Sequence, residues 1–193
     1  MLFGRRLDSN SCRYRLREQT GQAMWNDTEE PLAYFITFRT YGTWLHGDER
    51  GSTDRSNNVY GDPFIAPNTE WEGYNRRSLR SEPFVLNAAC RGVVEKAIRE
   101  VCEHYSWSLA AINVRSNHAH SVVQCSEDSS RRALRQFKTY STRRLKENGL
   151  WNKTHSPWAD KGSRRMIWNE QGFAAAVNYV ENRQGGPLPN LGS

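Results

Sequence analysis

The sequence predicts an α+β fold, a ferredoxin-like β-α-β-β-α-β sheet with an added C-terminal helix and a long polar loop after the first strand. The first observation behind this prediction is that short runs rich in β-branched and aromatic residues alternate with longer runs whose apolar residues recur at helical spacing. The second is that 193 residues suit one domain. The third is the aromatic content of 7 Trp, 8 Tyr and 7 Phe, which is too high for a disordered chain.

The first half of the chain supplies one strand and one helix, separated by a long polar segment. Residues 33–45, AYFITFRTYGTWL, predict a strand because β-branched and aromatic residues dominate them. Residues 46–80 are rich in Gly, Asn, Asp and Ser, which predicts a long loop. Ser81 then predicts a helix N-cap, and Pro83 suits the first turn of a helix that runs to about Tyr105.

The second half supplies the remaining elements. Residues 107–114 and 118–125 predict two strands joined by a tight turn. A helix follows over about 129–148, and residues 164–169 predict a fourth strand. A last helix over 172–184 ends at a Gly-Gly pair with a proline beyond it.

A single domain is expected over residues 31–188, with tails over 1–30 and 189–193. The first segment carries several arginines but no apolar stretch, so a secretory signal is not expected, and either Met1 or Met24 suits a start. No apolar run approaches 18 residues, which predicts no membrane span. The four cysteines form no C-x-x-C pair, so we expect reduced thiols and a cytoplasmic protein.

The net charge of +6 is concentrated in one segment. Residues 131–165 carry eleven Lys and Arg against only Glu147 and Asp160, a local charge of +9 on a slightly acidic remainder. Such a segment is typical of a surface that binds a phosphate backbone, although a solvated basic helix would give the same pattern.

A histidine pair opens the third predicted strand, in the run Asn117-His118-Ala119-His120. Residues i and i+2 of a strand point to the same face, about 6.6 Å apart along it. Two imidazoles placed in this way can converge on one metal ion. The spacing alone is weak evidence, because such a pair also arises incidentally in strands.

Tyr140 lies in the basic helix, on the shoulder of its apolar stripe. The stripe consists of Leu134, Phe137, Ser141 and Leu145. Positive charge from the neighbouring Lys138, Arg143 and Arg144 would favour the deprotonated, nucleophilic form of the Tyr140 hydroxyl. A core tyrosine with its hydroxyl at the surface would occupy the same position.

Together these motifs resemble the single-tyrosine HUH transposases of insertion sequences, including the REP-associated tyrosine transposases. The segments that carry the resemblance are Asn117-His118-Ala119-His120, Lys138 to Leu145, Phe38 to Leu45, Gly47 to Ser52, Tyr179-Val180 and Gln184-Gly185. The resemblance covers about 31–188.

The resemblance implies a metal-dependent single-stranded DNA endonuclease and strand transferase that acts in DNA transposition. It implies that His118 and His120 hold Mg²⁺ or Mn²⁺, and that Tyr140 attacks to form a 5′-phosphotyrosine intermediate. The DNA-binding residues it implies are Arg131, Arg132, Arg135, Lys138, Arg143, Arg144, Arg164 and Arg165. Hairpin element ends are the expected substrate, a homodimer is one expected assembly, and the DNA-bound protein would be associated with the nucleoid.

The third metal ligand stays open. Some members of that family carry a glutamine one helical turn after the tyrosine, but Arg144 occupies this place and cannot ligate. The remaining candidates are His46, Asp48, Asp54 and, less suitably by direction, Gln136. Two other functions also remain open, a non-catalytic single-stranded nucleic-acid-binding protein of the same fold and a metal-dependent hydrolase that uses water as its nucleophile.

Overall fold

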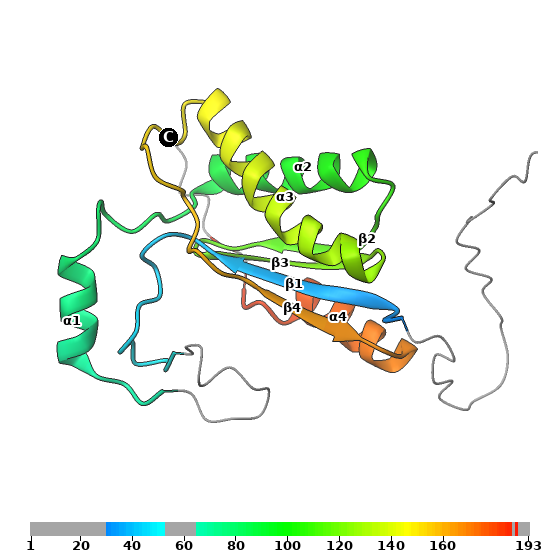
Figure 1. The fold of residues 1–193 in the computed structure, drawn as a ribbon, viewed down its shortest axis with the longest axis horizontal. Helices are drawn as coiled ribbons and strands as arrows, with labels where there is room; N and C mark the ends of the chain where they lie inside the picture. The colour runs from blue at the N-terminus through cyan, green and yellow to red at the C-terminus, as the bar shows by residue number, and fades with distance from the viewer. Residues whose placement is uncertain (1–29, 53–64, 187, 189–193) are drawn as a thin grey trace, which may run out of the picture.

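The computed structural model describes residues 30–52, 65–186 and 188, and shows a four-stranded antiparallel sheet with helices on both faces (Figure 1). The strands are β1 (Ala33–Arg39), β2 (Ser108–Val114), β3 (His118–Gln124) and β4 (Ser163–Ile167). Their order across the sheet is β2-β3-β1-β4, with every neighbouring pair antiparallel. This order, together with the β-α-β-β-α-β chain order of the sheet, confirms the predicted ferredoxin-like fold.

The helices divide between the two faces. Helices α2 (Ala88–His104) and α3 (Glu127–Glu147) pack together over one face, whereas α4 (Glu170–Asn182) covers the other (Figure 1). A fourth helix, α1 (Thr69–Arg77), lies to one side of the sheet beside the loop that follows β1 (Figure 1). None of the described helices is long and apolar enough to cross a membrane.

Alternation along the central strands decides which side chains meet which helices. In β1, Tyr34 and Ile36 belong to the large core under α2 and α3, whereas Ala33 belongs to the smaller core under α4. In β3, Ala119 joins the large core and Val122 joins the smaller one. Because side chains alternate along a strand, His118 and His120 lie on the same face as Val122, the face that α4 covers.

The second helix begins later than the sequence predicts. Ser81 is not its N-cap, because α2 starts after Asn87, whose side chain accepts a hydrogen bond from the backbone N–H of Cys90. The residues before Asn87 are held outside the helix by backbone bonds to distant partners. Phe84 N–H donates to Tyr41, and Leu86 N–H donates to Ser116. These tertiary bonds outweigh the local capping signal.

The first strand also ends early, and the long polar segment contains a helix. Strand β1 stops at Arg39 rather than at residue 45, and Gly42 (φ +71°) turns the chain away from the sheet. Helix α1 is capped by Asn68, whose side chain accepts from Trp71 N–H. The helix was missed because polar residues dominate it and none of its residues is buried.

Several predictions fall outside the described residues. These are the tail before residue 30, the tail over 189–193, and the part of the long loop over 53–64, which includes Asp54. The described cysteines, Cys90, Cys102 and Cys125, are free thiols.

Candidate active site

The histidine pair lies close together on the α4 face of the sheet. The ring centroids of His118 and His120 are 4.5 Å apart. His120 is 9% exposed, stacks on Phe35 at 5.1 Å, and shares a 2.7 Å hydrogen bond between its Nδ1 and the Thr37 hydroxyl. Strand pairing places Thr37 directly opposite His120, so the register of β1 and β3 fixes the orientation of this ring.

Both imidazoles are neutral at physiological pH. Burial, and after it the nearby charges of His118 and Arg39, lower the pKa of His120 to about 3. Burial also lowers the pKa of His118. A neutral imidazole offers a nitrogen lone pair, which is the form that binds a metal ion.

The side-chain amide of Gln184 completes a set of three possible ligands. Its Oε1 lies 3.3 Å from His118 Nε2, and its Nε2 donates to the backbone carbonyl of Tyr179. The other ring nitrogen of His118 lies 2.7 Å from Asn117 Oδ1. A neutral His118 has one N–H for these two oxygens, so one of them faces a lone pair. A cation placed between His118 Nε2 and Gln184 Oε1 would satisfy both.

This donor set fits a divalent metal ion. The described part of the chain contains no cluster of three His, Cys, Asp or Glu that could hold one, so an amide oxygen is the available third ligand. Two imidazole nitrogens and one oxygen suit Mn²⁺ well and also accept Mg²⁺, which prefers oxygen.

Tyr179 is the tyrosine that the structure brings to the histidines. It lies on α4, 43% exposed, with its ring edge-on to His120 at 5.8 Å and to Phe35 at 5.9 Å. Helix α4 packs against the sheet through Ala176 and Val180, which fixes the position of Tyr179 between the sheet and solvent. Its ring is therefore held beside His120 while the side chain stays partly exposed to solvent.

Tyr140 lies on the opposite side of the sheet. It is part of α3 and packs against the large core that α2 and α3 share, with the Arg143 guanidinium 6.0 Å from its ring. The sheet separates it from His118 and His120, so the structure does not bring the predicted nucleophile to the predicted metal ligands. The sequence did contain a signal for Tyr179 as the nucleophile. Gln184 follows it by five residues, a little over one helical turn, which is close to the tyrosine–glutamine spacing of some family members.

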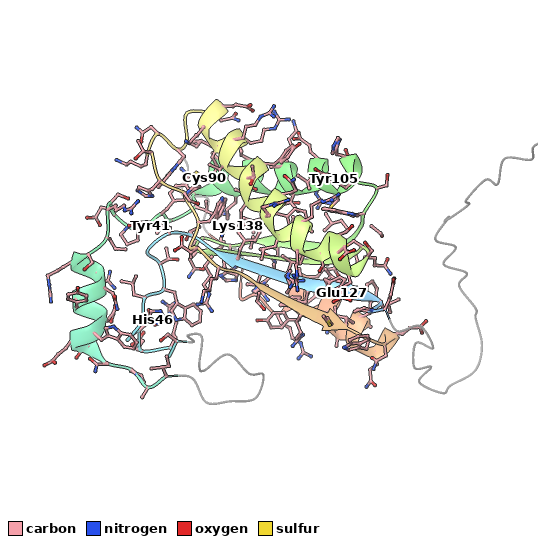
Figure 2. The ribbon with its side chains drawn as sticks, in the orientation of Figure 1. Tyr41, His46, Cys90, Tyr105, Glu127 and Lys138 are labelled. Atoms are coloured by element: carbon pink, nitrogen blue, oxygen red, sulfur yellow. The ribbon has the colours of Figure 1, made fainter. Side chains whose placement is uncertain are left out.

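The candidates for a third ligand in the described chain are engaged elsewhere. His46 Nδ1 bonds with the Ser52 hydroxyl, and the His46 ring stacks on Trp71 beside α1 (Figure 2). Asp48 forms an ion pair with Arg50. Gln136 belongs to α3, on the face that carries Tyr140.

Most of the predicted DNA-binding residues also lie away from the histidines. Six of the eight are on α3, namely Arg131, Arg132, Arg135, Lys138, Arg143 and Arg144. Arg144 pairs with Glu100 and Glu147. Lys138 donates to the carbonyl oxygens of Ala159 and Asp160. On β4, Arg164 donates to the Ser130 hydroxyl on the α3 side.

Arg165 is the predicted DNA-binding residue on the histidine face. It lies opposite Phe35 in the strand register, with its guanidinium 5.3 Å from the Phe35 ring. Together with Tyr179 and Arg183 it lines a pocket of about 480 Å³ between α4 and the sheet. This pocket offers positive charge directly beside the candidate nucleophile.

Other arginines surround the site and were not selected from the sequence. Positive charge on Arg39, Arg115 and Arg50 contributes to lowering the pKa of His118. Arg115 also donates two hydrogen bonds to the Gly186 carbonyl, which holds the segment after α4 against the turn before β3. Such a cationic surrounding suits an anionic substrate.

Comparisons with known proteins relate more than half of the chain to one family. A family model described as "Transposase IS200 like" matches residues 79–183. No curated protein matches the chain significantly. Solved structures that match include a REP-associated tyrosine transposase bound to a REP hairpin, at 13% identity and a TM-score of 0.45, covering 86% of this chain and 70% of that one. Another is a protein of Deinococcus radiodurans R1 described as a candidate transposase, at 13% identity and a TM-score of 0.39, covering 89% of this chain and all of that one.

Proposed function

This chain belongs to the IS200-like transposase family, and from that premise we propose that it cuts and rejoins single-stranded DNA through a covalent link to Tyr179. One observation carries the proposal. On a single face of the sheet, an accessible tyrosine on α4 meets a pair of neutral histidines and the amide oxygen of Gln184. The proposal replaces Tyr140 with Tyr179 because, of these two residues, Tyr179 is the one on the face of the histidines.

The proposed cofactor is a divalent metal ion, Mg²⁺ or Mn²⁺, held by His118, His120 and Gln184. When bound, such an ion neutralises charge on phosphate oxygens and aligns the phosphate for attack. Asn117 supports this arrangement, because its side-chain oxygen lies 2.7 Å from Nδ1 of His118 and leaves Nε2 to face the ion.

The covalent step exchanges one phosphodiester linkage for another. The hydroxyl oxygen of Tyr179 forms a bond to phosphorus, and the bond between phosphorus and the 3′-oxygen breaks. The tyrosine proton passes to solvent, and the departing 3′-oxygen takes up a proton to become a hydroxyl. The 5′-phosphotyrosine link conserves the bond energy, so attack by another 3′-hydroxyl reverses the step without ATP.

The DNA strand would enter beside Tyr179. Arg165 and Arg183 line the pocket next to this tyrosine and supply charge for the phosphate backbone. We propose DNA with hairpin ends as the substrate, by analogy with the hairpin bound to the related REP-associated protein. We also propose that one chain forms a complete site, because the ring of Tyr179 lies 5.8 Å from that of His120 within the same chain.

The decisive experiment is detection of the covalent adduct. The full chain is incubated with a pool of single-stranded hairpin oligonucleotides and Mn²⁺, and the products are digested and analysed by mass spectrometry. We expect DNA attached to the peptide that contains Tyr179, no adduct in Tyr179→Phe, and no adduct in EDTA.

Tyr140→Phe is the matched control, since it removes one hydroxyl from the other face of the sheet. It should form the adduct at a rate within about twofold of the unmodified chain. An adduct on Tyr140, or cleavage that survives Tyr179→Phe, would refute the assignment. Binding without any adduct in the unmodified chain would favour a non-catalytic DNA-binding protein.

A further inference from the structure

Arg39 is a partly buried cation at the edge of the proposed site. It is the last residue of β1, and strand pairing places it directly opposite His118. Alternation along β1 puts it on the same face as Thr37, which contacts His120. Within the described residues, its guanidinium has no ion pair and no hydrogen bond to a side chain or carbonyl, although it is only partly exposed.

The indole of Trp44 holds this guanidinium in place. The central carbon of the Arg39 guanidinium lies 3.4 Å from the centre of the Trp44 ring, a close stacking contact. Trp44 itself is anchored, because its Nε1–H donates to the Gly51 carbonyl at 2.7 Å. The long side chain of Arg39 therefore has a defined direction, which an exposed arginine lacks.

A second arginine at the same indole provides an internal comparison. The Arg50 guanidinium lies 4.4 Å from the Trp44 ring, but it also forms an ion pair and a hydrogen bond with Asp48. Two cations thus lie against one aromatic ring, and of the two only Arg50 forms an ion pair with Asp48. The Asp48 carboxylate raises the pKa of Arg39 without bonding to it, so within the described residues the donors of the Arg39 guanidinium have no carboxylate partner.

The electrostatics agree with this geometry. Burial and the nearby charge of Arg50 lower the pKa of Arg39, Asp48 raises it, and the result is a pKa of about 10, so Arg39 remains charged at neutral pH. Its charge in turn contributes to lowering the pKa of both His118 and His120, which requires the guanidinium to be near both rings. A partly desolvated cation that forms no direct ion pair is stabilised when an anion binds beside it.

We propose that Arg39 binds a non-bridging oxygen of the phosphate that Tyr179 attacks, and that Trp44 is the positioning residue that aims it. This inference rests on the proposed function. The guanidinium adds a fixed positive charge where negative charge increases as the new phosphorus–oxygen bond forms. Arg39 is then a catalytic residue, and its planar donors bind a phosphate in a way that a lysine reproduces only in part.

The first test needs no DNA cleavage. The full chain, labelled with ¹⁵N-arginine, is titrated with inorganic phosphate while the arginine Nε–H resonances are recorded. Arg39→Gln identifies the Arg39 signal by its loss. We expect this signal to shift with phosphate in the unmodified chain, whereas the signal of Arg99, which pairs with Glu95 on α2, stays in place. An Arg39 signal that does not move would overturn the proposal, whether or not the protein cleaves DNA.

The second test uses an oligonucleotide that forms the Tyr179 adduct, prepared with either phosphate or neutral methylphosphonate at the cleaved linkage. On the phosphate substrate, Arg39→Gln should slow adduct formation about 100-fold, and Arg39→Lys should slow it less. On the methylphosphonate substrate the same variants should differ from the unmodified chain by less than about threefold, because the charge that Arg39 binds is absent.

Arg99→Gln is the matched control, since it removes the same charge from a surface ion pair. It should leave both rates within about twofold. An equal loss on the two substrates in Arg39→Gln would show a structural role and contradict the proposal. Thermal melts of the variants by circular dichroism establish that each one is folded.

The positioning role of Trp44 predicts that substitutions of Trp44 affect the rate only when Arg39 is present. Trp44→Leu should lower the rate on the phosphate substrate, and Trp44→Phe should restore most of it, because a smaller aromatic face still supports the guanidinium. In an Arg39→Gln background, Trp44→Leu should cause less than a twofold further loss. Additive losses would contradict the positioning role.

Discussion

The histidines, the glutamine and the tyrosine of the proposed site come from two segments 59 or more residues apart in the chain, and each is fixed by local bonds. The strand register orients His120 through Thr37, and Asn117 holds one nitrogen of His118. The Gln184 amide is oriented from behind by its bond to the backbone of Tyr179. At the residue scale, hydrogen bonds within the fold therefore orient both histidines and the glutamine.

Removal of the Gln184 amide should weaken metal binding. We expect Gln184→Ala to raise the Kd for Mn²⁺ about tenfold, and Gln184→Glu to lower it, because a carboxylate is a charged oxygen ligand. The measurement is Mn²⁺ titration of the full chain by electron paramagnetic resonance. Gln136→Ala, on α3, is the control and should leave the Kd unchanged. An unchanged Kd in Gln184→Ala would exclude this residue as a ligand.

At the element scale, the sequence predicted the strands and the long helices well. The predicted bounds of β2, β3 and α3 lie within two residues of the observed ones, because their hydrophobic periodicity is strong. The start of α2 was missed because it depends on contacts with distant parts of the chain, such as the bond between Leu86 N–H and Ser116. Helix α1 was missed because polar residues dominate it and none of its residues is buried, so it has no hydrophobic periodicity to detect.

The choice between Tyr140 and Tyr179 could not be made from periodicity. Periodicity shows which side of a helix is buried and which strand residues share a face, but it does not show which face of the sheet the helix covers. Tyr140 has more basic neighbours in the sequence, whereas Tyr179 lies on the face of the sheet that carries the histidines. The histidine pair was found because both residues belong to one strand, where spacing alone determines their relation.

The turn at Gly47, which packs against the start of α1, gives a test at the element scale. Gly47 has φ +92°, and a Cβ there would lie 2.3 Å from the Asn68 carbonyl oxygen. Gly47→Ala should therefore lower the free energy of unfolding by about 2 kcal/mol or more, measured by urea denaturation. Gly92, inside α2, has open space around its Cβ position, so Gly92→Ala should stabilise the protein by about 0.5–1 kcal/mol. Equal effects in the two variants would contradict the described turn.

At the scale of the whole molecule, basic residues occupy both faces of the sheet. The concentrated positive charge of residues 131–165 belongs mainly to α3, across the sheet from the histidines. The arginines around the histidines come instead from separate segments, among them Arg39, Arg115, Arg165 and Arg183. We therefore expect α3 to add affinity for the DNA backbone on the face opposite the proposed chemistry, in addition to Arg165 and Arg183 beside Tyr179.

This separation predicts that affinity and rate respond to different substitutions. Replacement of Arg131, Arg132 and Arg135 by glutamine should weaken binding of single-stranded DNA and reduce the slope of log K against log salt by about 2. At saturating DNA, the rate of adduct formation should stay within about twofold. Fluorescence anisotropy at several salt concentrations and adduct kinetics measure the two quantities. An unchanged slope would show that α3 does not contact the backbone.

The bond between Arg115 and Gly186 has a consequence for how the protein tolerates change. Arg115 lies in the turn that leads into the histidine strand, and Gly186 follows Gln184 by two residues. These two hydrogen bonds therefore link the strand of the proposed metal ligands directly to the end of α4, independently of the chain that lies between them. An insertion far from these hydrogen bonds can therefore lengthen the protein without changing the spacing between the histidine pair and the end of α4.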